Sequence, residues 1–251
     1  MTGNSAASLQ NIISSYQSIA EVTKAEPVAV RSLTQISGNE PANDTYFYRQ
    51  WGSNYINCDA AWQVETGDSR VVVAIEDQGI DYNHPDLDGN MWTNAGEIPN
   101  NGIDDDGNGY IDDYYGYNFG NDNGNIAIDY HGTHVAGTVA AETNNGLGVT
   151  GVAGGTGNND GVRLMSLSVF GNGAQGGFDE AFVYAADMGA VISQNSWGGG
   201  AQSDALEDAI DYFVANAGGP GEALNGGLAV FAAGNENSDY GYPAMYEPVL
   251  S

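Results

Sequence analysis

Basic residues are scarce in this chain of 251 residues. It has 5 Lys and Arg against 33 Asp and Glu, which gives a formal net charge of −28 at pH 7. A surface of this kind repels nucleic acid and anionic membranes, so we expect neither as a partner. The acidic residues are spread along the chain and interleaved with aromatic residues, which favours a folded acidic protein over a disordered tail. Such a surface suits multivalent cations or a salty medium.

Cysteine and long apolar runs are also scarce. The one cysteine, Cys58, permits neither an intrachain disulfide nor a cysteine metal cluster, and we expect it to be a small buried apolar residue. No run of about 18 apolar residues occurs, so no membrane-spanning helix is expected. The first residues, Met1 to Ser5, lack a basic region followed by an apolar block and do not resemble a signal peptide.

The first 42 residues differ from the rest of the chain. They hold two of the five basic residues, Lys24 and Arg31, and almost no glycine. The pattern predicts a helix over 9–19 and an extended segment over 27–30. We interpret residues 1–42 as an appendage or linker, and residues 43–251 as the main domain.

Apolar strands alternate with amphipathic helices in residues 43–251. Strands are predicted over 71–75, 162–169, 190–193 and 228–233, and helices over 131–142, 178–186 and 203–217. Residues 94–125 are rich in Gly, Asn and Asp without a hydrophobic period, and are predicted to form an elaborated loop. The alternation predicts an α/β fold with a parallel sheet, whose ligand site lies beyond the carboxyl ends of the strands.

Three polar residues stand at such strand ends or at a helix start. Asp77 follows the strand 71–75, His131 opens a helix, and Asn235 follows the strand 228–233. Taken singly, each has a structural explanation, as a turn cap, a helix-start histidine and a left-handed turn residue. Because all three stand where parallel sheets place their ligand sites, they are together candidates for one shared site.

Four segments resemble the motifs of the subtilisin-like serine proteases. Residues 73–87 resemble the catalytic-aspartate segment, and 131–138, His-Gly-Thr-His-Val-Ala-Gly-Thr, resemble the histidine motif. Residues 194–198, Gln-Asn-Ser-Trp-Gly, and 232–235, Ala-Ala-Gly-Asn, resemble the substrate strand and the oxyanion segment. The similarity covers about residues 44–251. It implies a three-layer α/β subtilisin-like fold with a mostly parallel central sheet, and a secreted endopeptidase that cleaves polypeptides through an Asp-His-Ser triad.

The resemblance also implies a role for each matching residue. His131 is the base that takes the serine proton, Asp77 orients the imidazole, and the Asn235 amide donates to the developing oxyanion. The implied substrate-binding residues come from two segments, Ser196, Trp197 and Gly198, and Ala232, Ala233 and Gly234.

The sequence departs from the family pattern near Asp77 and in the nucleophile. Glu76 stands where the family has an apolar residue and Gln78 where it has a small hydroxyl residue, and a carboxylate beside Asp77 predicts an altered pH range. No Gly-Thr-Ser-Met-Ala-like segment occurs, and Ser251 is merely the last residue. We therefore expect a chain truncated before the catalytic serine, with the C-terminal part of the fold missing and no activity by the triad route. The alternative is a non-catalytic calcium- or peptide-binding pseudoprotease.

Five aspartates crowd residues 101–113. Asp104, Asp106, Asn108 and Gly109 match the start of an EF-hand loop and Asp112 its ninth position, although Tyr115 replaces the twelfth-position glutamate. A solvated acidic turn is the alternative, but so many carboxylates repel one another unless a hard cation is present. Calcium is therefore the predicted cofactor. The predicted ligand residues are Asp104, Asp106, Asn108, Tyr110 and Asp112, with Asp86 added by its match to another calcium position of the family.

Residues 1–42 occupy the place of the family's propeptide. Residues 25–28 and 44–52 resemble the junction between a propeptide and the mature start. The resemblance thus implies a propeptide remnant, which makes the chain's own propeptide a predicted partner beside a polypeptide substrate.

Overall fold

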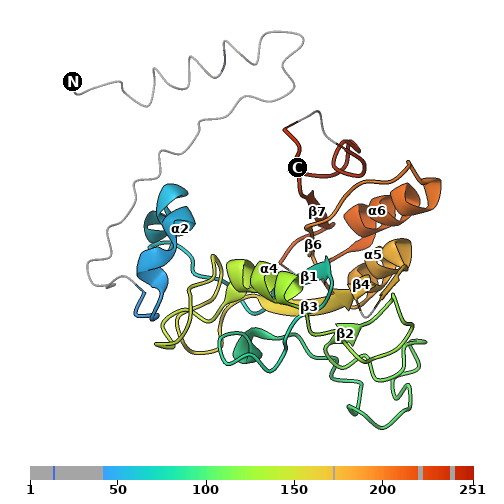
Figure 1. Ribbon diagram of the computed structural model, residues 1–251, viewed down its shortest axis with the longest axis horizontal. Coiled ribbons are helices and arrows are strands. Elements are labelled where there is room, and N and C mark those ends of the chain that lie inside the picture. Colours follow the sequence, from blue (N-terminus) through green and yellow to red (C-terminus); the bar gives the residue numbers. More distant parts are fainter. Residues whose placement is uncertain (1–13, 15–41, 172, 220–222, 238–240) are drawn as a thin grey trace. The chain divides into compact units, whose positions relative to one another are not determined.

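Five parallel strands form the central sheet of the unit Gly38–Ser251. The computed structural model describes Ser14 and residues 42–171, 173–219, 223–237 and 241–251 (Figure 1). The sheet order is β2-β3-β1-β6-β7, and each neighbouring pair is parallel. The strands are β1 (Val72–Asp77), β2 (Gly116–Tyr117), β3 (Arg163–Ser168), β6 (Ile192–Asn195) and β7 (Leu228–Phe231).

Helices cover both faces of this sheet because β1 is apolar on both. Val73 and Ile75 pack on one side, in the core cluster that holds the buried face of α4 (Tyr130–Ala140). Ala74 points to the other side, into the cluster of α5 (Phe178–Asp187) and α6 (Asp204–Asn216). Strand residues that are buried on both faces are typical of parallel sheets. The predicted three-layer α/β fold is confirmed.

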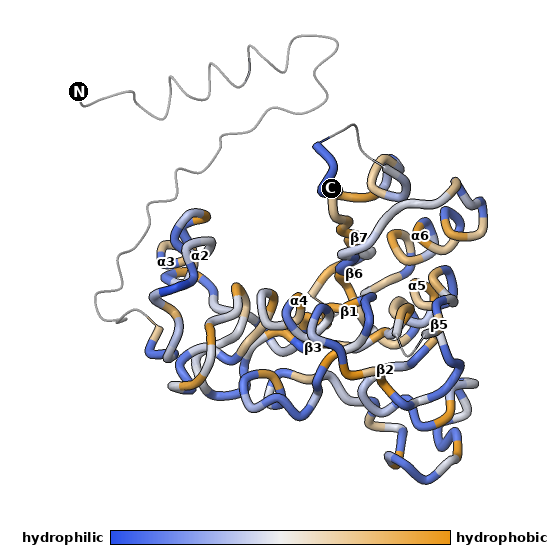
Figure 2. The backbone as a smooth tube through the Cα atoms, viewed as in Figure 1, coloured by the Kyte–Doolittle hydropathy of each residue, from blue (hydrophilic) through white to orange (hydrophobic). Residues whose placement is uncertain are grey.

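Short elements complete the described fold. They are η1 (Phe47–Arg49), α2 (Trp51–Tyr55), α3 (Cys58–Ala61), η2 (Asp88–Asn90) and the antiparallel pair β4 (Phe170–Gly171) and β5 (Ala174–Gln175). Cys58 is 3% exposed, as its prediction as a buried apolar residue requires. The loops around β2 are mostly hydrophilic, whereas hydrophobic residues gather along β1 and β3 (Figure 2).

The observed boundaries differ from the predicted ones near the strand ends. β1 runs on to Asp77, and β6 begins at Ile192 and runs on to Asn195, because backbone pairing with neighbouring strands extends past the apolar run. The predicted loop 94–125 contributes one strand, β2, which pairs with β3. The predicted helix 9–19, apart from Ser14, and the extended segment 27–30 lie outside the described residues. Among the helices described, none has the length and apolarity that a membrane crossing requires.

Candidate active site

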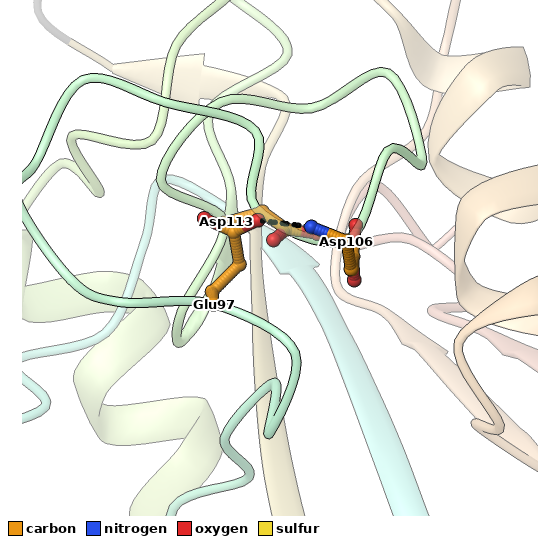
Figure 3. A group of neighbouring side chains, drawn as sticks. All are labelled: Glu97, Asp106 and Asp113. Atoms are coloured by element: carbon orange, nitrogen blue, oxygen red, sulfur yellow. Dashed lines mark hydrogen bonds between the residues drawn. The ribbon is translucent and has the colours of Figure 1, made fainter.

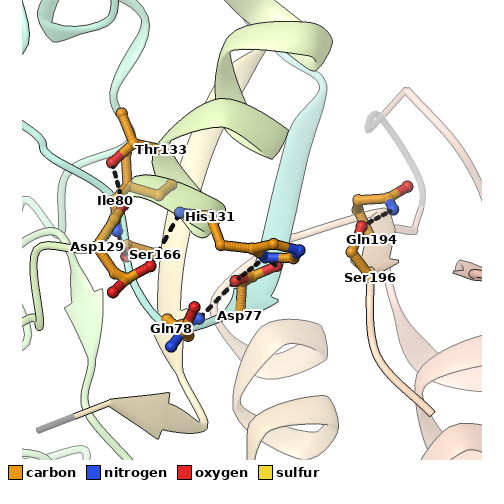
Figure 4. A network of polar contacts seen from close by, with 9 residues as sticks. All are labelled: Asp77, Gln78, Ile80, Asp129, His131, Thr133, Ser166, Gln194 and Ser196. Carbon is orange, nitrogen blue, oxygen red and sulfur yellow. Dashed lines mark hydrogen bonds and ion pairs between the residues drawn. The ribbon is translucent and has the colours of Figure 1, made fainter.

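Asp77 and His131 meet at the carboxyl end of β1 (Figure 4). The ring Nδ1 of His131 lies 2.7 Å from Oδ1 and 2.9 Å from Oδ2 of the Asp77 carboxylate. The Asp77 side chain is 3% exposed, and the His131 side chain is 45% exposed. The pair therefore has a buried acidic end and an imidazole that opens to solvent.

The contact with Asp77 fixes the tautomer of the His131 ring. Both carboxylate oxygens are acceptors, so Nδ1 carries the hydrogen and donates it to Asp77. The neutral ring then keeps its lone pair on Nε2, the nitrogen that faces away from Asp77. Asp77 Oδ1 also accepts a hydrogen bond from the Gln78 backbone N–H, at 2.7 Å, which holds the carboxylate in place. An imidazole in this arrangement can accept a proton from a hydroxyl placed at Nε2.

A capping aspartate sets the start of the histidine helix. α4 begins at Tyr130, and the Asp129 side chain accepts a hydrogen bond from the His131 backbone N–H at 2.9 Å. Thr133 donates its hydroxyl to the Asp129 carbonyl and accepts from the Asp81 backbone N–H at 2.9 Å. Figure 4 draws the side chains of Asp129, His131 and Thr133, and the bond from Asp81 ties this first turn of α4 to the segment that follows β1.

Two glycines let the same two segments touch. A Cβ on Gly132 would overlap the carbonyl oxygen of Gly79, and a Cβ on Gly79 would overlap the carbonyl oxygen of Ala127. Gly79 also has a φ of +117°, a conformation that other residues rarely adopt. The first turn of α4 thus lies directly on the turn after β1, which brings His131 to Asp77.

The predicted substrate segment continues from β6, which is the neighbour of β1 in the sheet. Gln194 donates to the Ser196 hydroxyl at 3.2 Å, and Gly198 is exposed. Trp197 packs with its ring centroid 4.9 Å from Phe178 and 5.1 Å from Phe231. Trp197 and Gly198 line a cavity of about 440 Å³, whose wall also includes Phe170, Phe178, Leu206 and Tyr242. An exposed glycine backbone beside an aromatic hollow can take an extended peptide and one of its side chains.

The predicted oxyanion segment lies beyond the end of β7. Ala232 donates its backbone N–H to the Asn195 carbonyl, and residues 232–235 are exposed. Asn235 donates its own backbone N–H to Glu236 at 2.9 Å. Because β1, β6 and β7 are parallel, Asn235 lies at the same edge of the sheet as Asp77.

A separate group of three carboxylates lies in the loop before β2 (Figure 3). Ligand oxygens of Glu97, Asp106 and Asp113 are all within 4.8 Å of one another. Asp113 is fully buried, and its carboxylate accepts from the Asn94 amide at 2.8 Å and from the Tyr184 hydroxyl at 2.7 Å. This acidic group is one that could hold a metal ion.

Glu97 is the member of this group that has a buried oxygen without a hydrogen-bond donor among the described residues. Its Oε1 accepts the Asp105 backbone N–H at 2.8 Å, but its buried Oε2 has no hydrogen-bond partner in the described part of the chain. Burial raises the pKa of Glu97, and the carboxylates of Asp113 and Asp105 raise it further. A buried oxygen without a donor, next to two other carboxylates, fits a hard cation such as calcium.

Most of the predicted calcium ligands have other contacts. Asp104 caps its own turn, since its carboxylate accepts the backbone N–H groups of residues 107–109, and Asp112 does the same for 101 and 102. The Tyr110 ring packs on Tyr117 and Tyr184. Asp106 is thus the one predicted ligand within the three-carboxylate group.

The remaining two predicted ligands are Asn108, which contacts the three-carboxylate group, and Asp86, which lies apart from it. The Asn108 amide donates to Asp113 at 2.9 Å, so Asn108 supports the group as a hydrogen-bond donor. Asp86 is buried, and its carboxylate accepts from the Asn145 amide at 2.9 Å and from the Val149 backbone N–H at 2.8 Å. Its present contacts therefore tether the loop 145–149.

Sequence reasoning missed Glu97, Asp113 and Asp129. Asp129 carried a usable signal, since an aspartate two residues before the histidine of a helix start is a typical N-cap. Glu97 and Asp113 carried none, because they lie outside the EF-hand spacing and only the folded loop joins them to Asp106.

A larger cavity, of about 790 Å³, lies apart from this chemistry. Residues of α2 and α4, including Trp51, His134 and Thr138, line it together with His84 from the segment between β1 and η2. Neither Asp77 nor His131 contributes to its wall, so we do not assign it to the active site.

Comparison with known proteins finds relatives that match most of this chain. A thermophilic serine proteinase of Bacillus sp. (strain AK1) is 36% identical over 216 residues, which are 83% of this chain and 44% of that protein. A halolysin-like extracellular serine protease of Natrialba magadii is 33% identical over 220 residues, which are 84% of this chain and 35% of that protein. The chain spans less than half the length of these curated relatives.

The comparison with solved structures and the comparison with family models agree. A solved protease structure from Pseudoalteromonas arctica PAMC 21717 superimposes with a TM-score of 0.55 at 30% identity, covering 79% of this chain and 60% of that one. The peptidase S8 model, which describes the subtilase family, matches residues 68–251. The chain, whose strand-end Asp77 is hydrogen-bonded to His131 in the first turn of α4, therefore belongs to the subtilase family.

Proposed function

We propose that this chain is the part of a serine endopeptidase that supplies the aspartate and the histidine of an Asp-His-Ser triad. The observation that carries the proposal is the Asp77–His131 pair, with Nδ1 of the ring donating to a buried carboxylate and Nε2 left as the acceptor. A serine hydroxyl becomes a competent nucleophile only when a neighbouring base takes its proton, and the His131 ring is oriented to do so.

Each remaining step is assigned to a residue at the same sheet edge. His131 takes the serine proton as the carbonyl is attacked and returns it to the leaving amine, while Asp77 stabilises the imidazolium that forms. The Asn235 amide donates to the oxyanion, a contribution of about 3–4 kcal/mol in such enzymes. Asn235 is exposed at the end of β7, where a substrate carbonyl is accessible to it.

The substrate of the proposed reaction is an extended polypeptide. Its backbone would pair with the exposed segment that follows Ser196, where three glycines, Gly198 to Gly200, leave the chain accessible. One of its side chains would enter the cavity beside Trp197, where aromatic and aliphatic walls favour an apolar group. Ala232, Ala233 and Gly234 would face the substrate from the other side as exposed backbone.

The nucleophile is assigned to a serine outside these 251 residues. The printed sequence has no Gly-Thr-Ser-Met-Ala-like segment. Within the described residues, the hydrogen bonds of the His131 ring involve Nδ1 alone. The 251-residue chain itself is then expected to be inactive by the triad route.

The experiment compares this chain with a longer product that includes the coding sequence that follows residue 251. The longer protein should hydrolyse an unstructured peptide and react with a fluorophosphonate serine probe, and the 251-residue chain should do neither. In the longer protein, His131→Ala should lower kcat by about 10⁶-fold and Asp77→Asn by about 10⁴-fold, the sizes found for other triads.

A neighbouring histidine provides the matched control. His134 is exposed on α4, three residues from His131, so His134→Ala should keep activity close to wild type. The proposal is wrong if His131→Ala retains peptide hydrolysis comparable with His134→Ala. Stoichiometric labelling of a serine in the 251-residue chain would instead show that the nucleophile lies within these residues.

We also infer that the group of Glu97, Asp106 and Asp113 binds calcium. Three carboxylates supply hard oxygen ligands, and within the described residues the buried Oε2 of Glu97 has no hydrogen-bond partner. The ion would hold the loop before β2 in place. Asp104 and Asp112 then act by capping the turns of the same loop, and Asp86 by tethering the loop 145–149.

Residues 1–42 are proposed to be a propeptide remnant, and the protein is proposed to act outside the cell. The first proposal rests on the resemblance of residues 25–28 and 44–52 to a propeptide junction. The second is supported by the extracellular relative from Natrialba magadii and by the acidic composition. N-terminal sequencing of the protein recovered from culture medium tests both, and a start near residue 43 is the expected result.

A further inference from the structure

Glu76 is a fully buried carboxyl group in the middle of the sheet, one residue before Asp77. Side chains alternate along a strand, so Glu76 points to the face covered by α5 and α6, while Asp77 points to the α4 face. Ala74, two residues earlier, packs in the α5 and α6 cluster and confirms that orientation. The proposed triad does not use Glu76, and its burial therefore requires a separate explanation.

Among the described residues, no cationic side chain pairs with the Glu76 carboxyl group. Within the described residues its hydrogen-bond partner is the Ser193 hydroxyl, which donates to Oε1 at 2.9 Å. Its other oxygen, Oε2, is buried without a donor. Burial raises the pKa of Glu76 to about 8, and the Ser193 hydrogen bond offsets only part of that rise. An ionised carboxylate without a counter-charge is strongly disfavoured in such a place.

A second buried oxygen on the neighbouring strand also has no donor. Asn195 is the residue paired with Glu76 across β1 and β6, and its buried Oδ1 has no partner in the part of the chain that the structure describes. The orientation of this amide is set by its nitrogen, which donates to the Ser193 hydroxyl at 2.8 Å and to the Val230 carbonyl at 3.2 Å. Reversing the amide would lose the bond to Val230, and its oxygen would then compete with Glu76 for the one Ser193 hydroxyl proton. The orientation with Oδ1 as the free acceptor keeps all three bonds.

One proton shared by these two oxygens would give each of them a partner. The Ser193 hydroxyl already links the two side chains, since it accepts from Asn195 and donates to Glu76. A hydrogen on Glu76 Oε2, donated to Asn195 Oδ1, would close a ring of three hydrogen bonds among Glu76, Ser193 and Asn195. Every polar atom of the ring would then have a partner, which is the normal condition of buried groups.

We propose that Glu76 is held in its neutral, protonated form and, by this ring with Ser193 and Asn195, is a positioning residue that fastens the ends of β1 and β6 together. β1 ends in Asp77, and β6 leads directly into Ser196, Trp197 and Gly198. This ring of hydrogen bonds therefore sets the separation between Asp77 and the substrate segment. This last consequence rests on the proposed function, whereas the ring itself does not.

The surroundings of Glu76 contain few other groups that titrate. β6 and β7 contribute none, and β3 contributes Arg163 at its opposite end, where its guanidinium donates to the carbonyls of Gly89 and Asn159. On β1, Asp77 lies on the other face. The titratable residues of the two covering helices are Asp179, Glu180, Tyr184 and Asp187 on α5, and Asp204, Glu207, Asp208, Asp211 and Tyr212 on α6. Tyr184 is the buried one, and its hydroxyl donates to Asp113.

The first test detects the proton directly in the 251-residue chain. Infrared spectra at pH 6 to 7 should show the C=O band of a protonated carboxyl in wild type that is absent from Glu76→Gln. Other buried carboxyls cancel in the difference spectrum because both proteins contain them. Glu180→Gln removes an exposed glutamate of α5 and serves as the control, with no such difference band. A difference band of an ionised carboxylate at Glu76 would overturn the proposal.

The second test uses the pH dependence of unfolding. The unfolded chain releases the Glu76 proton near its ordinary pKa of 4.5 and the folded chain near 8, so wild type loses stability as pH rises between these values. The unfolding equilibrium constant of wild type, divided by that of Glu76→Gln, should rise about tenfold per pH unit over that range and level off above it. A ratio that stays constant from pH 5 to 8 contradicts a bound proton.

The positioning role has its own readout. The carboxamide of Glu76→Gln can accept from Ser193 and donate to Asn195, so this variant should keep the ring without titrating. Backbone amide resonances of Ser196, Trp197 and Gly198 should shift between pH 7 and 9 in wild type and stay fixed in Glu76→Gln. Glu76→Leu breaks the ring and should be less stable than Glu76→Gln at every pH, or fail to fold. If Glu76→Leu matches Glu76→Gln in stability, or if the three resonances titrate equally in both proteins, Glu76 does not fasten the strands.

Discussion

Replacing Glu97 by glutamine tests the calcium proposal through electrostatics. Ligand oxygens of Glu97 and Asp113 lie within 4.8 Å of each other, and both side chains are buried. Two like charges at that separation repel by about 3.5 kcal/mol at an effective dielectric constant of about 20, and the repulsion from the exposed Asp106 is weaker. Without a cation this repulsion opposes folding. Glu97→Gln removes it and keeps an oxygen to accept the Asp105 backbone N–H.

Calcium reverses the order of stability of the two proteins. A cation bound only by the folded chain stabilises it by about 2.7 kcal/mol at a hundredfold excess over Kd. For a domain of this size that corresponds to a rise in Tm of about 5–11 °C. Wild type should therefore melt higher in millimolar calcium than in chelator, and magnesium should restore less of the loss because it prefers strict octahedral geometry. Glu97→Gln should melt at or above wild type in chelator and below it in calcium.

The assay is calorimetry in chelator, calcium and magnesium for each protein, on the longer product if the 251-residue chain does not melt cooperatively. Asp112→Asn is the matched control, because Asp112 caps a turn of the same loop outside the three-carboxylate group. It should lower Tm by a similar amount in chelator and in calcium. If wild type melts at the same temperature in chelator and in calcium, the loop binds no calcium. If Glu97→Gln shows the same rise in Tm from chelator to calcium as wild type, the ion lies elsewhere.

Two further predictions concern how the structure brings His131 to Asp77. Asp129→Ala removes the side-chain cap of α4 and should lower the free energy of unfolding by about 1 kcal/mol, measured by urea denaturation; an unchanged midpoint would contradict the capping role. Gly79→Ala should destabilise by roughly 3 kcal/mol or more, because its Cβ would overlap the Ala127 carbonyl at a φ of +117°. Gly137→Ala, at an open position within α4, should instead be neutral or stabilising by up to about 1 kcal/mol, and equal effects of the two glycine substitutions would refute the close-packing explanation.

Local pattern was sufficient to predict the layers of the fold. The apolar run that contains Val73 and Ile75 predicts a buried parallel strand, and the spacing of Phe178, Phe182 and Ala185 predicts a helix with one buried face. Both patterns depend on neighbours a few residues apart, which one sequence displays directly. The strand ends were less predictable, because β1 and β6 are extended past their apolar runs by pairing with each other.

The contact between Asp77 and His131 follows from the sequence only through a motif. The two residues are 54 positions apart, and what joins them is a strand end, a capped helix start and two glycines that allow backbone contact. For the group of Glu97, Asp106 and Asp113, in contrast, the sequence motif did not identify which residues lie together. The spacing of Asp104, Asp106 and Asp112 indicated calcium, yet the fold turns Asp104 and Asp112 toward backbone N–H groups and places Glu97 and Asp113 beside Asp106. Asp104 and Asp112 stay predicted ligands, because a carboxylate that accepts backbone N–H groups has further lone pairs for a cation.

The end of β1 carries two carboxyl groups with opposite requirements. Asp77 accepts from the His131 imidazole on the α4 face and from the Gln78 backbone N–H, and these contacts favour a charged carboxylate. On the other face, Glu76 accepts from the Ser193 hydroxyl at Oε1, and its buried Oε2 has no donor among the described residues, so a neutral carboxyl is favoured. A slip of β1 by one residue would exchange the two faces and place each group where its protonation state is wrong. The same polar contacts that prepare the site chemically therefore also fix the register of the strand that carries it.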